Sequence, residues 1–374
     1  MKVYILQENL TKGLTAVNRF ITTKTQLPIL NNILIKTDQG RLKLSATNLE
    51  TGINFWLGAK IEKEGEVCIP AKTLAEYITS LPADKIDLEV ENNLLKIHSG
   101  SYQAQFLTSP SVEFPEIPTL EKKPEINLSF KDLSLAINQV AFAATQDEGR
   151  PVLTGVLLKV KKQSLFLVAT DGYRLSVKEI KDLKEIEKIK ETEELLIPAR
   201  ALIEVGKVMS SNNSENNLGL TITPKNNQII FSNSEVEIIS RLIEGKFPDF
   251  EKIIPEKGKT KIVIETESLL QAVRTTSIFA REAANIIKME VSDSKIEISA
   301  NNPQMGENKI KLEAKTEGEG GKIAFNSRYL IDFLNSTKSD LINLQINDAL
   351  SPGVFSPVDD PSYLHVIMPI RLQE

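Results

Sequence analysis

The sequence has one cysteine, two histidines and no long apolar run, and each shortage excludes a class of protein. Because Cys68 is the only cysteine, no disulfide can form within the chain and no thiolate cluster can hold a soft metal ion. His98 and His365 lie far apart in segments that alternate like strands, so they predict no metal centre. The apolar run from Val3 to Leu6 is too short for the core of a signal peptide, and no segment is long enough to span a bilayer. We expect a cytoplasmic protein.

Catalytic patterns are also scarce. Neither a Walker-type phosphate loop nor a dinucleotide fingerprint is present. The glycine-rich segment 318–321 is interrupted by an acidic residue and no helix follows at once, so it predicts a hairpin turn. Asp171 and Gly172 predict a turn between two strands. A hydrolase or transferase that uses Asp171 and Arg174 at a cleft is the alternative, but no base, nucleophile or metal set accompanies them, so we expect no catalysis, no cofactor and no metal.

The chain does contain a threefold repeat. Ile69–Leu74 (IPAKTL) returns as Ile197–Leu202 (IPARAL) and more loosely as Phe325–Leu330 (FNSRYL), at steps of 128 residues between positions 69, 197 and 325. A second marker occurs in the same order, as Ala46-Thr47-Asn48, Ala169-Thr170-Asp171 and Ala300-Asn301-Asn302. Two markers at nearly one period indicate a triplicated domain, each copy large enough to have a core of its own. We expect domains at 1–122, 123–253 and 254–374.

Each repeat shows the same order of elements: a short strand, an amphipathic helix, paired strands, a second helix and closing strands. The expected helices are 7–24, 71–81, 131–146, 199–211, 267–282 and 327–338. This order predicts an α+β fold in which each of three repeated domains packs two helices on antiparallel sheets.

Charge is unevenly distributed along the chain. The net charge is −5 at pH 7, yet bases outnumber acids in the six expected helices. An acidic protein with basic helices suits a polyanion that approaches from one surface only. The sequence shows neither aromatic interleaving nor a recognition-helix pattern, so contacts with a nucleic acid should go to phosphates. Ordinary solvated helix faces explain this charge pattern equally well.

Three such repeats resemble the bacterial DNA polymerase III β subunit family, the sliding clamps. The residues that carry the resemblance are Ala169–Leu175 (ATDGYRL), Arg150–Gly155 (RPVLTG), Lys246–Asp249 (KFPD), Val366–Leu372 (VIMPIRL) and Leu27–Asn32 (LPILNN). The resemblance implies a head-to-tail homodimer that closes a six-domain ring around duplex DNA without reading its sequence. It implies a processivity factor that tethers the replicative polymerase. A clamp-fold scaffold without DNA binding stays open as a second alternative.

The resemblance also implies three sets of site residues. A pocket for short Leu- or Phe-containing peptides of the polymerase, the clamp loader and other partners should comprise Leu153, Thr170, Gly172, Tyr173, Arg174, Leu175, Pro248, Lys252, Ile253, Leu350, Pro352, Val366, Ile367, Met368, Pro369, Ile370 and Arg371, with Arg174 and Arg371 holding carbonyls or a carboxylate. The DNA-facing set should comprise Lys12, Arg19, Lys24, Lys72, Arg150, Arg200, Lys207, Arg274 and Arg328. The dimer contact should comprise Leu74, Tyr77, Ile78, Ala104, Phe106, Ile278 and Phe279. Tyr173 and the terminal Gln373-Glu374 depart from many members of the family.

Overall fold

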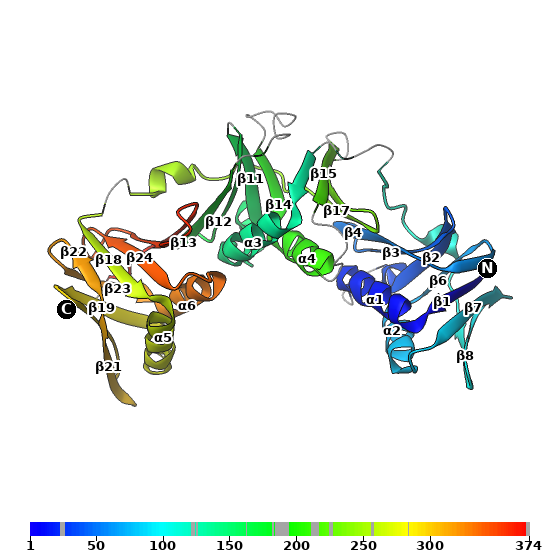
Figure 1. Cartoon of the computed structure of the whole chain (residues 1–374), viewed down its shortest axis with the longest axis horizontal. Coiled ribbons are helices and arrows are strands. Elements are labelled where there is room, and N and C mark those ends of the chain that lie inside the picture. Colours follow the sequence, from blue (N-terminus) through cyan, green and yellow to red (C-terminus); the bar gives the residue numbers. More distant parts are fainter. Residues whose placement is uncertain are drawn as a thin grey trace. The chain divides into compact units, whose positions relative to one another are not determined.

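The computed structural model describes residues 1–22, 27–120, 124, 126–161, 163–181, 183, 194–210, 217–223, 227–255, 258–282 and 284–371. By its contacts the chain divides into two compact units (Figure 1). Unit 1 holds Met1–Lys131 and Glu204–Leu242, and unit 2 holds Asp132–Ile203 and Ile243–Glu374. Each unit therefore combines one outer repeat with part of the middle repeat. Among the described residues, no helix is both long enough and apolar enough to cross a membrane.

Unit 1 contains two antiparallel sheets. The eight-stranded sheet has the order β10 (Ile126–Ser129), β15 (Asn217–Thr223), β16 (Gln228–Ser232), β17 (Val236–Arg241), β4 (Thr51–Leu57), β3 (Arg41–Thr47), β2 (Asn32–Asp38) and β6 (Glu66–Pro70). The five-stranded sheet has the order β5 (Lys60–Lys63), β1 (Lys2–Leu6), β7 (Lys85–Glu91), β8 (Leu94–Ser99) and β9 (Tyr102–Leu107).

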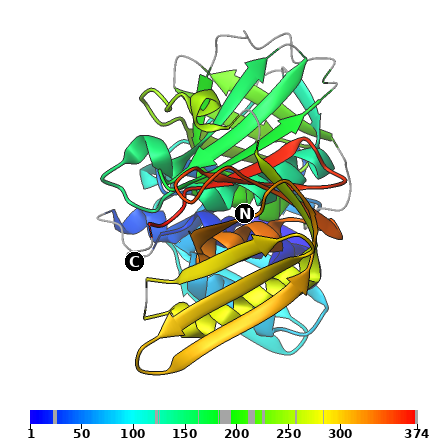
Figure 2. The ribbon, with the colours of Figure 1, turned by 90° about the vertical axis from the view of Figure 1, so that its left-hand side faces the viewer.

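Unit 2 also contains two antiparallel sheets. The nine-stranded sheet has the order β14 (Glu194–Pro198), β11 (Gly155–Lys161), β12 (Ser164–Thr170), β13 (Arg174–Ile180), β26 (Tyr363–Ile367), β25 (Gly353–Pro357), β24 (Leu341–Ile346), β18 (Thr260–Glu265) and β22 (Lys315–Glu317). The four-stranded sheet has the order β21 (Gly306–Glu313), β20 (Lys295–Asn302), β19 (Ile286–Ser292) and β23 (Gly321–Asn326), and Figure 2 shows it in front of its helix.

The six expected helices are all present: α1 (Gln7–Val17), α2 (Ala71–Ser80), α3 (Phe130–Val140), α4 (Ala199–Ser210), α5 (Thr266–Ala280) and α6 (Ser327–Ser336). The first and third are shorter than expected because each ends in a 3-10 turn, η1 (Asn18–Phe20) and η4 (Ala141–Ala143). In the first case the turn buries Phe20, and Ile21 is already extended. The apolar spacing therefore runs past the end of the α-helix.

The repeated sequence segment builds the same structure in each copy. It ends a strand (β6, β14 or β23) and then opens a helix, at Ala71, Ala199 and Ser327. These helix starts keep the spacing of the sequence motif. The threefold repeat of the sequence is thus a threefold repeat of elements.

The hairpin expected at 318–321 is wrong. β22 before it pairs with β18 in the nine-stranded sheet, whereas β23 after it pairs with β19 in the four-stranded sheet. The segment therefore crosses between sheets. Gly318 has φ +112°, and a Cβ there would lie 2.4 Å from the carbonyl oxygen of Lys259. Only glycine tolerates both this backbone conformation and this close approach.

Two strand pairs continue a sheet from one sequence repeat into the next. We call the pairing of β4 with β17 in unit 1 the first seam, and the pairing of β13 with β26 in unit 2 the second seam. In Figure 2 the red β26 lies beside the green strands of the middle repeat. The peptide pocket expected from the sequence falls at the second seam.

Candidate functional site

The two faces of the second seam differ in chemistry because side chains alternate along a strand. On one face, which we call the groove face, Leu175 and Val177 of β13 join Val366 of β26 in an apolar cluster with Phe247 and Phe250. On the opposite face, which we call the helix face, lie Arg174, Ser176, His365 and Ile367. A surface for apolar anchors can therefore exist on the groove face only.

Exposed apolar side chains occur on the segments that adjoin the strands of the groove face and on η8. Tyr173 is 61% exposed, Leu350 58%, Met368 40% and Ile253 39%, whereas Leu175 is 2% exposed. The backbone N–H of Met368 donates to the carbonyl oxygen of Tyr173 at 2.8 Å, which joins the two sides of the rim. Where exposed apolar side chains form one contiguous patch, they mark an interaction surface.

The structure places the other expected pocket residues on the segments beside this seam. Thr170 ends β12 and pairs with Leu175, Leu153 lies on η5 (Pro151–Thr154), and Lys252 with Ile253 lies on η8 (Phe250–Ile253). Gly172, Pro248, Pro352, Pro369, Ile370 and Arg371 lie in the connecting segments. Gln373 and Glu374 lie outside the described residues.

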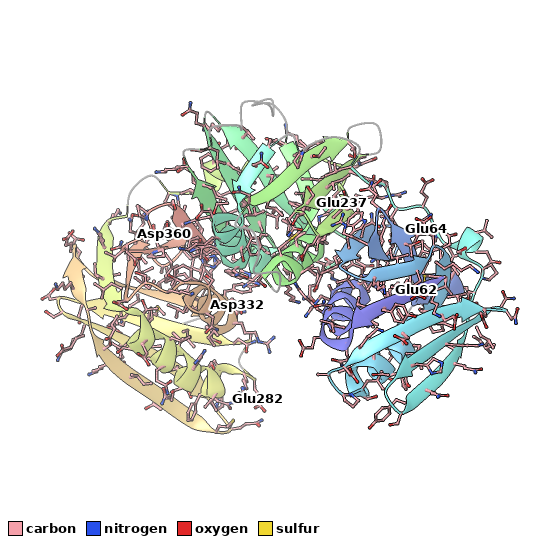
Figure 3. The ribbon with its side chains drawn as sticks, turned by 45° about the vertical axis from the view of Figure 1, so that its right-hand side comes forward. Glu62, Glu64, Glu237, Glu282, Asp332 and Asp360 are labelled. Atoms are coloured by element: carbon pink, nitrogen blue, oxygen red, sulfur yellow. The ribbon has the colours of Figure 1, made fainter. Side chains whose placement is uncertain are left out.

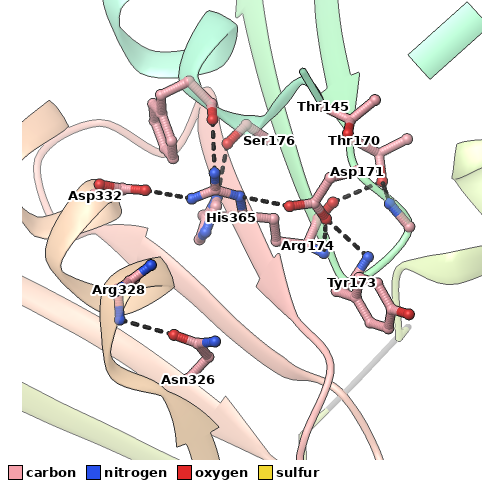
Figure 4. Close-up of polar contacts among 12 residues, drawn as sticks. Thr145, Thr170, Asp171, Tyr173, Arg174, Ser176, Asn326, Arg328, Asp332 and His365 are labelled. Atoms are coloured by element: carbon pink, nitrogen blue, oxygen red, sulfur yellow. Dashed lines mark hydrogen bonds and ion pairs between the residues drawn. The ribbon is translucent and has the colours of Figure 1, made fainter. Parts of the chain in front are cut away.

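Two of the expected pocket residues lie on the wrong face. Ile367 is fully buried in the core beneath α5 and α6, one position along the strand from Val366. Arg174 points to the helix face, where Nε donates to Asp171 Oδ2 (3.1 Å), Nη1 to Asp332 Oδ2 (2.6 Å) and Nη2 to the carbonyl oxygen of Phe142 (2.8 Å), as Figure 4 shows. Each of the three guanidinium nitrogens already donates within the fold and the side chain is 10% exposed, so the geometry does not support the expectation that Arg174 holds a partner carbonyl.

Asp171 stabilises a turn. Its Oδ1 accepts the backbone N–H groups of Tyr173 (2.8 Å) and Arg174 (3.0 Å), and its Oδ2 pairs with the Arg174 guanidinium. Both oxygens of this buried carboxylate are thus engaged in fixing the connection between β12 and β13. This geometry argues against the alternative of an enzyme that uses Asp171 and Arg174.

Arg150 lies just before η5, bonds to the same turn and is not part of an α-helix. Its Nη1 donates to the carbonyl oxygen of Asp171 (2.9 Å) and its Nε to Asp147 Oδ2 (3.0 Å). Because these bonds fix the guanidinium against the loop that precedes η5, the expected DNA-facing role of Arg150 has no support in the geometry.

The remaining DNA-facing candidates lie on helices, except Lys24, which lies outside the described residues. Some have acidic partners in the fold: Lys12 lies 3.7 Å from Glu235, Arg19 3.3 Å from Glu204 and Lys207 2.9 Å from Glu204. Arg274 donates to Asn335 at 2.8 Å. Lys72, Arg200 and Arg328 are exposed, and within the described ranges none of the three forms an ion pair.

The dimer candidates lie on or beside two edge strands. β9 ends the five-stranded sheet and β21 ends the four-stranded sheet. Ala104 and Phe106 are half-buried on β9, and the Phe106 ring meets Tyr77 of α2 at 5.6 Å between centroids. Near β21, Ile278 of α5 is 45% exposed. A groove of about 470 Å³ lies between α5 and β21.

Three of the dimer candidates are less accessible than a contact requires. Leu74 is 1% exposed and Ile78 is fully buried, so both belong to the core of unit 1 and their assignment to a contact is wrong. Both face inward because they lie one turn apart on the apolar stripe of α2. Phe279 is partly buried against the core of unit 2.

Sequence reasoning missed several residues that shape the site. Phe247 and Phe250 belong to the apolar cluster, although neither was among the residues expected to form the pocket. Asp332 on α6 and the carbonyl of Phe142 hold Arg174, and the labelled Asp332 can be located in Figure 3. No local sequence pattern connects these positions, which are up to 158 residues from Arg174.

Comparisons with known proteins cover the whole length of the chain. Family models match at residues 1–119 (DNA polymerase III beta subunit, N-terminal domain), 127–249 (central domain) and 251–371 (C-terminal domain). The beta sliding clamp of Staphylococcus aureus is 30% identical over 362 residues, which is 94% of each chain. The solved beta subunit of Thermotoga maritima DNA polymerase III is 29% identical with a TM-score of 0.91, and the Bacillus subtilis sliding clamp is 28% identical with a TM-score of 0.91, each over all of both chains.

Proposed function

Because the chain belongs to the family of the DNA polymerase III beta subunit, we propose that it is a DNA sliding clamp, a processivity factor that encircles duplex DNA and tethers the replicative polymerase. It is an accessory subunit and catalyses no reaction of its own. Its place of action is the cytoplasm, with the DNA that it encircles.

The observation that carries this proposal is a base at the second residue of α2, α4 and α6. Lys72, Arg200 and Arg328 occupy this position in the three repeats and are all exposed. The N-terminus of a helix carries a partial positive charge, so a base in the first turn is unfavourable for the helix itself. A repeated base at an unfavourable position indicates a role towards an external anion. A helix N-terminus also favours phosphate oxygens in general, although at α6 the Arg328 N–H is already capped by Asn326 Oδ1.

Contacts of this kind are made to the DNA backbone and carry no sequence information. Lys207 lies further along α4, whereas Lys12 lies on α1, Arg19 on η1 and Arg274 on α5, and all four add positive charge to the helices. Because several of them are paired with acids in the free protein, the three unpaired bases should contribute most to binding. Association should weaken steeply with salt.

A ring requires a second copy of the chain. We infer three domains at 1–122, 123–253 and 254–374, supported by the three family models and by the repeated elements. We infer a head-to-tail homodimer in which β9 of one protomer extends the sheet of β21 in the other, since each is the open edge of its sheet. Tyr77, Phe106 and Ile278 are the proposed apolar contacts.

The partner site is the groove face of the second seam. Short Leu- or Phe-containing peptides of the polymerase, the clamp loader and other partners would dock on Tyr173, Met368, Ile253 and Leu350, over the floor of Leu175 and Val366. Leu153, Pro248, Lys252, Pro352 and Arg371 lie on the flanking segments. Arg371 is exposed and remains available for a carbonyl or carboxylate.

Retention on circular against linear DNA tests the function. Protein loaded by a clamp loader on nicked circular DNA should stay bound through gel filtration at high salt, and linearising the DNA should release it. Release from both forms would favour the alternative of a clamp-fold scaffold without DNA binding. Equal retention on both would indicate ordinary electrostatic binding in place of encirclement.

A further inference from the structure

The two seams pair equivalent strands of neighbouring repeats, so a difference between them can be compared position by position. In the first seam Gly52 pairs with Ile239, and at the equivalent place in the second seam Leu175 pairs with Val366. One position earlier, Thr51 occupies the place that Arg174 occupies in the second seam. The two seams therefore differ by an arginine at an otherwise equivalent turn.

The turn itself does not need that arginine. In the first seam Asn48 Oδ1 accepts the N–H groups of Glu50 (3.0 Å) and Thr51 (2.7 Å), and Thr47 Oγ1 donates to the Thr51 carbonyl oxygen (2.9 Å) and accepts the Leu49 N–H (3.0 Å).

In the second seam the same four bonds recur. Asp171 Oδ1 accepts from Tyr173 (2.8 Å) and Arg174 (3.0 Å), while Thr170 Oγ1 donates to the Arg174 carbonyl oxygen (2.6 Å) and accepts from Gly172 (3.1 Å). In each turn the side chain at this position also donates to the same partner residue, Thr51 Oγ1 to Asn48 Oδ1 (3.1 Å) and Arg174 Nε to Asp171 Oδ2 (3.1 Å). Because a threonine is enough to close this turn, the Nη1 and Nη2 groups of Arg174 serve another purpose.

The contacts of the Arg174 guanidinium indicate this purpose. The Arg174 side chain is 10% exposed, and its Cζ lies 4.5 Å from the ring centroid of Tyr329 and 5.3 Å from that of Phe142. Its three bonds run to its own turn, to η4 of the middle repeat and to Asp332 on α6 of the third repeat (Figure 4). The planar fork of arginine can hold three such acceptors at fixed directions, which lysine cannot do.

The turn that Arg174 fixes also carries the rim of the groove. Tyr173 lies between Asp171 and Arg174, and its carbonyl oxygen accepts the N–H of Met368. The bond between Arg174 and Asp332 therefore ties the turn that carries Tyr173 to the third repeat, which carries Met368. This bond lies on the helix face, on the other side of the sheet from the groove.

The first seam lacks both the arginine and an open groove face. Its outer surface is covered by the chain that leaves the first repeat: the N–H of Leu120 donates to Glu237 Oε1 (3.3 Å), and Asn54 Nδ2 donates to the Pro118 carbonyl oxygen (3.3 Å). A Cβ at Gly52 would lie 3.2 Å from Ile117. The arginine thus occurs at the seam whose groove face carries exposed apolar side chains.

We propose that Arg174 is a positioning residue for partner recognition, which fixes the Tyr173–Met368 rim of the groove face from the opposite side of the sheet through its bond to Asp332. This inference rests on the proposed partner site, but it assigns to Arg174 and Asp332 a role without any contact to the peptide. Loss of the bond lets the turn shift relative to the third repeat, so partner affinity falls while the fold persists.

The test compares variants on both sides of the bond. Asp332→Ala removes the acceptor, and because the Asp332 side chain is 43% exposed it leaves no buried cavity. Arg174→Lys keeps the positive charge but removes the planar guanidinium that donates in three directions. Asp332→Glu keeps an acceptor and serves as the conservative rescue. Thr51→Ala changes the equivalent position of the first seam and is the matched control.

The probe is a fluorescein-labelled peptide with Leu and Phe anchors among Ser and Gly residues, read by anisotropy against the same peptide with both anchors replaced by Ser. Asp332→Ala and Arg174→Lys should weaken binding about tenfold, the effect of losing one hydrogen bond between charged groups. Asp332→Glu should recover part of the affinity, and Thr51→Ala should bind normally. Retention on circular DNA should not change in any variant.

Urea unfolding separates positioning from a merely structural role. If Arg174 and Asp332 served only the stability of the fold, their variants would have a shifted unfolding midpoint but unchanged peptide affinity in the folded protein. That result would overturn the inference. Wild-type affinity in both Asp332→Ala and Arg174→Lys would overturn it as well. If wild-type protein did not distinguish the anchored peptide from the serine peptide, the partner site itself would be wrong, and the inference would fall with it.

Discussion

Ser176 Oγ lies 2.6 Å from Nδ1 of His365, and this hydrogen bond joins two fully buried side chains across the second seam. The imidazole stacks on Phe333 with ring centroids 5.2 Å apart. Within the described residues its Nε2 has no hydrogen-bond partner. Burial, with a smaller contribution from the Arg174 charge, lowers the pKa of His365 well below its ordinary value. The fold therefore holds a neutral histidine.

We expect this histidine to make stability depend on pH just below neutrality. Above pH ~6.5 the imidazole is neutral in the folded and unfolded states, so it contributes no pH dependence. As the pH falls below ~6.5, His365 is protonated in the unfolded chain but stays neutral in the folded chain. The free energy of unfolding therefore drops by at most about 1.4 kcal/mol per pH unit. The loss continues until the lowered folded pKa is reached. Urea unfolding between pH 7.5 and 5.5 measures this slope.

His365→Ile is the control, because the first seam has Ile238 at the equivalent position. The substitution leaves Ser176 without its partner, so the variant should be less stable at every pH. Its stability should nevertheless change less between pH 7.5 and 5.5 than that of the wild type. Parallel slopes for the two proteins would show that His365 is not the group that titrates.

The sequence was sufficient to predict which elements form and in what order. Equal spacing of the helix starts and alternating strands are local patterns, and they identified all six helices and the turn at Asp171. Strand partners are not local. Gly318–Gly321 resembles a hairpin, but β22 and β23 join different sheets because each finds its partner far along the chain. Local composition cannot distinguish these cases.

Neutralising the bases at the helix starts should weaken DNA binding without destabilising the fold. In the variant Lys72→Gln, Arg200→Gln, Arg328→Gln, each change removes a positive charge from the positive end of a helix, so the unfolding midpoint should stay constant or rise slightly. Affinity for a short duplex should fall, and the slope of log affinity against log salt should decrease by about 0.9 for each DNA phosphate that the variant no longer neutralises. Fluorescence anisotropy over a salt series measures both quantities.

Lys288→Gln is the matched control for this experiment. Lys288 is exposed on β19, where the neighbouring Ile287 and Met289 face the core, so Lys288 points away from α5. It should bind duplex DNA like the wild type. A triple variant that also bound like the wild type would contradict the assignment of the helix starts to DNA.

Residues at the rim and floor of the groove face should respond differently to truncation. Met368→Ala and Tyr173→Ala remove exposed side chains, so each should weaken the Leu- and Phe-containing peptide by about 1–3 kcal/mol and leave the unfolding midpoint unchanged. Leu175→Ala empties a position that is 2% exposed and should cost about 2–5 kcal/mol of stability. Titration calorimetry and urea unfolding separate the two effects. Normal peptide binding by both rim variants would show that the partner site does not lie on the groove face.

The sequence alone could not predict which face of the sheet each side chain at this site lies on. The family resemblance assigned Val366, Met368 and Leu175 to one pocket. In the structure Val366 packs in the cluster that contains Leu175, and the N–H of Met368 donates to the carbonyl oxygen of Tyr173. The resemblance could not show that Ile367 and Arg174 face the helices, because the register that decides this is set by pairing between β13 and β26. A shift of one residue would have reversed every face. Leu74 and Ile78 were misassigned for a similar reason, since an apolar helix position can face a core or a partner.

The contact between protomers should weaken when its apolar anchors are truncated. Phe106→Ala with Ile278→Ala removes one side chain from each of the two different surfaces that a head-to-tail contact joins. A ring has two such contacts, so a weakening of about 1.4 kcal/mol at each raises the dissociation constant about 100-fold. Val112→Ser is the control, because Val112 is 89% exposed and lies on η3 (Ser111–Glu113), which is part of neither edge strand. Sedimentation at nanomolar concentration should show monomer for the double variant only.

Cross-linking can show that the contact is head-to-tail. Cys68 is buried, and burial raises its pKa to about 12, so it should not react with maleimides in the folded protein. Gln103→Cys on β9 and Lys309→Cys on β21 then provide the only reactive thiols. A short bismaleimide should join the two variants when they are mixed, because one surface meets the other. Each variant alone should give no covalent dimer. A covalent dimer of Gln103→Cys with itself would instead indicate a contact between identical surfaces.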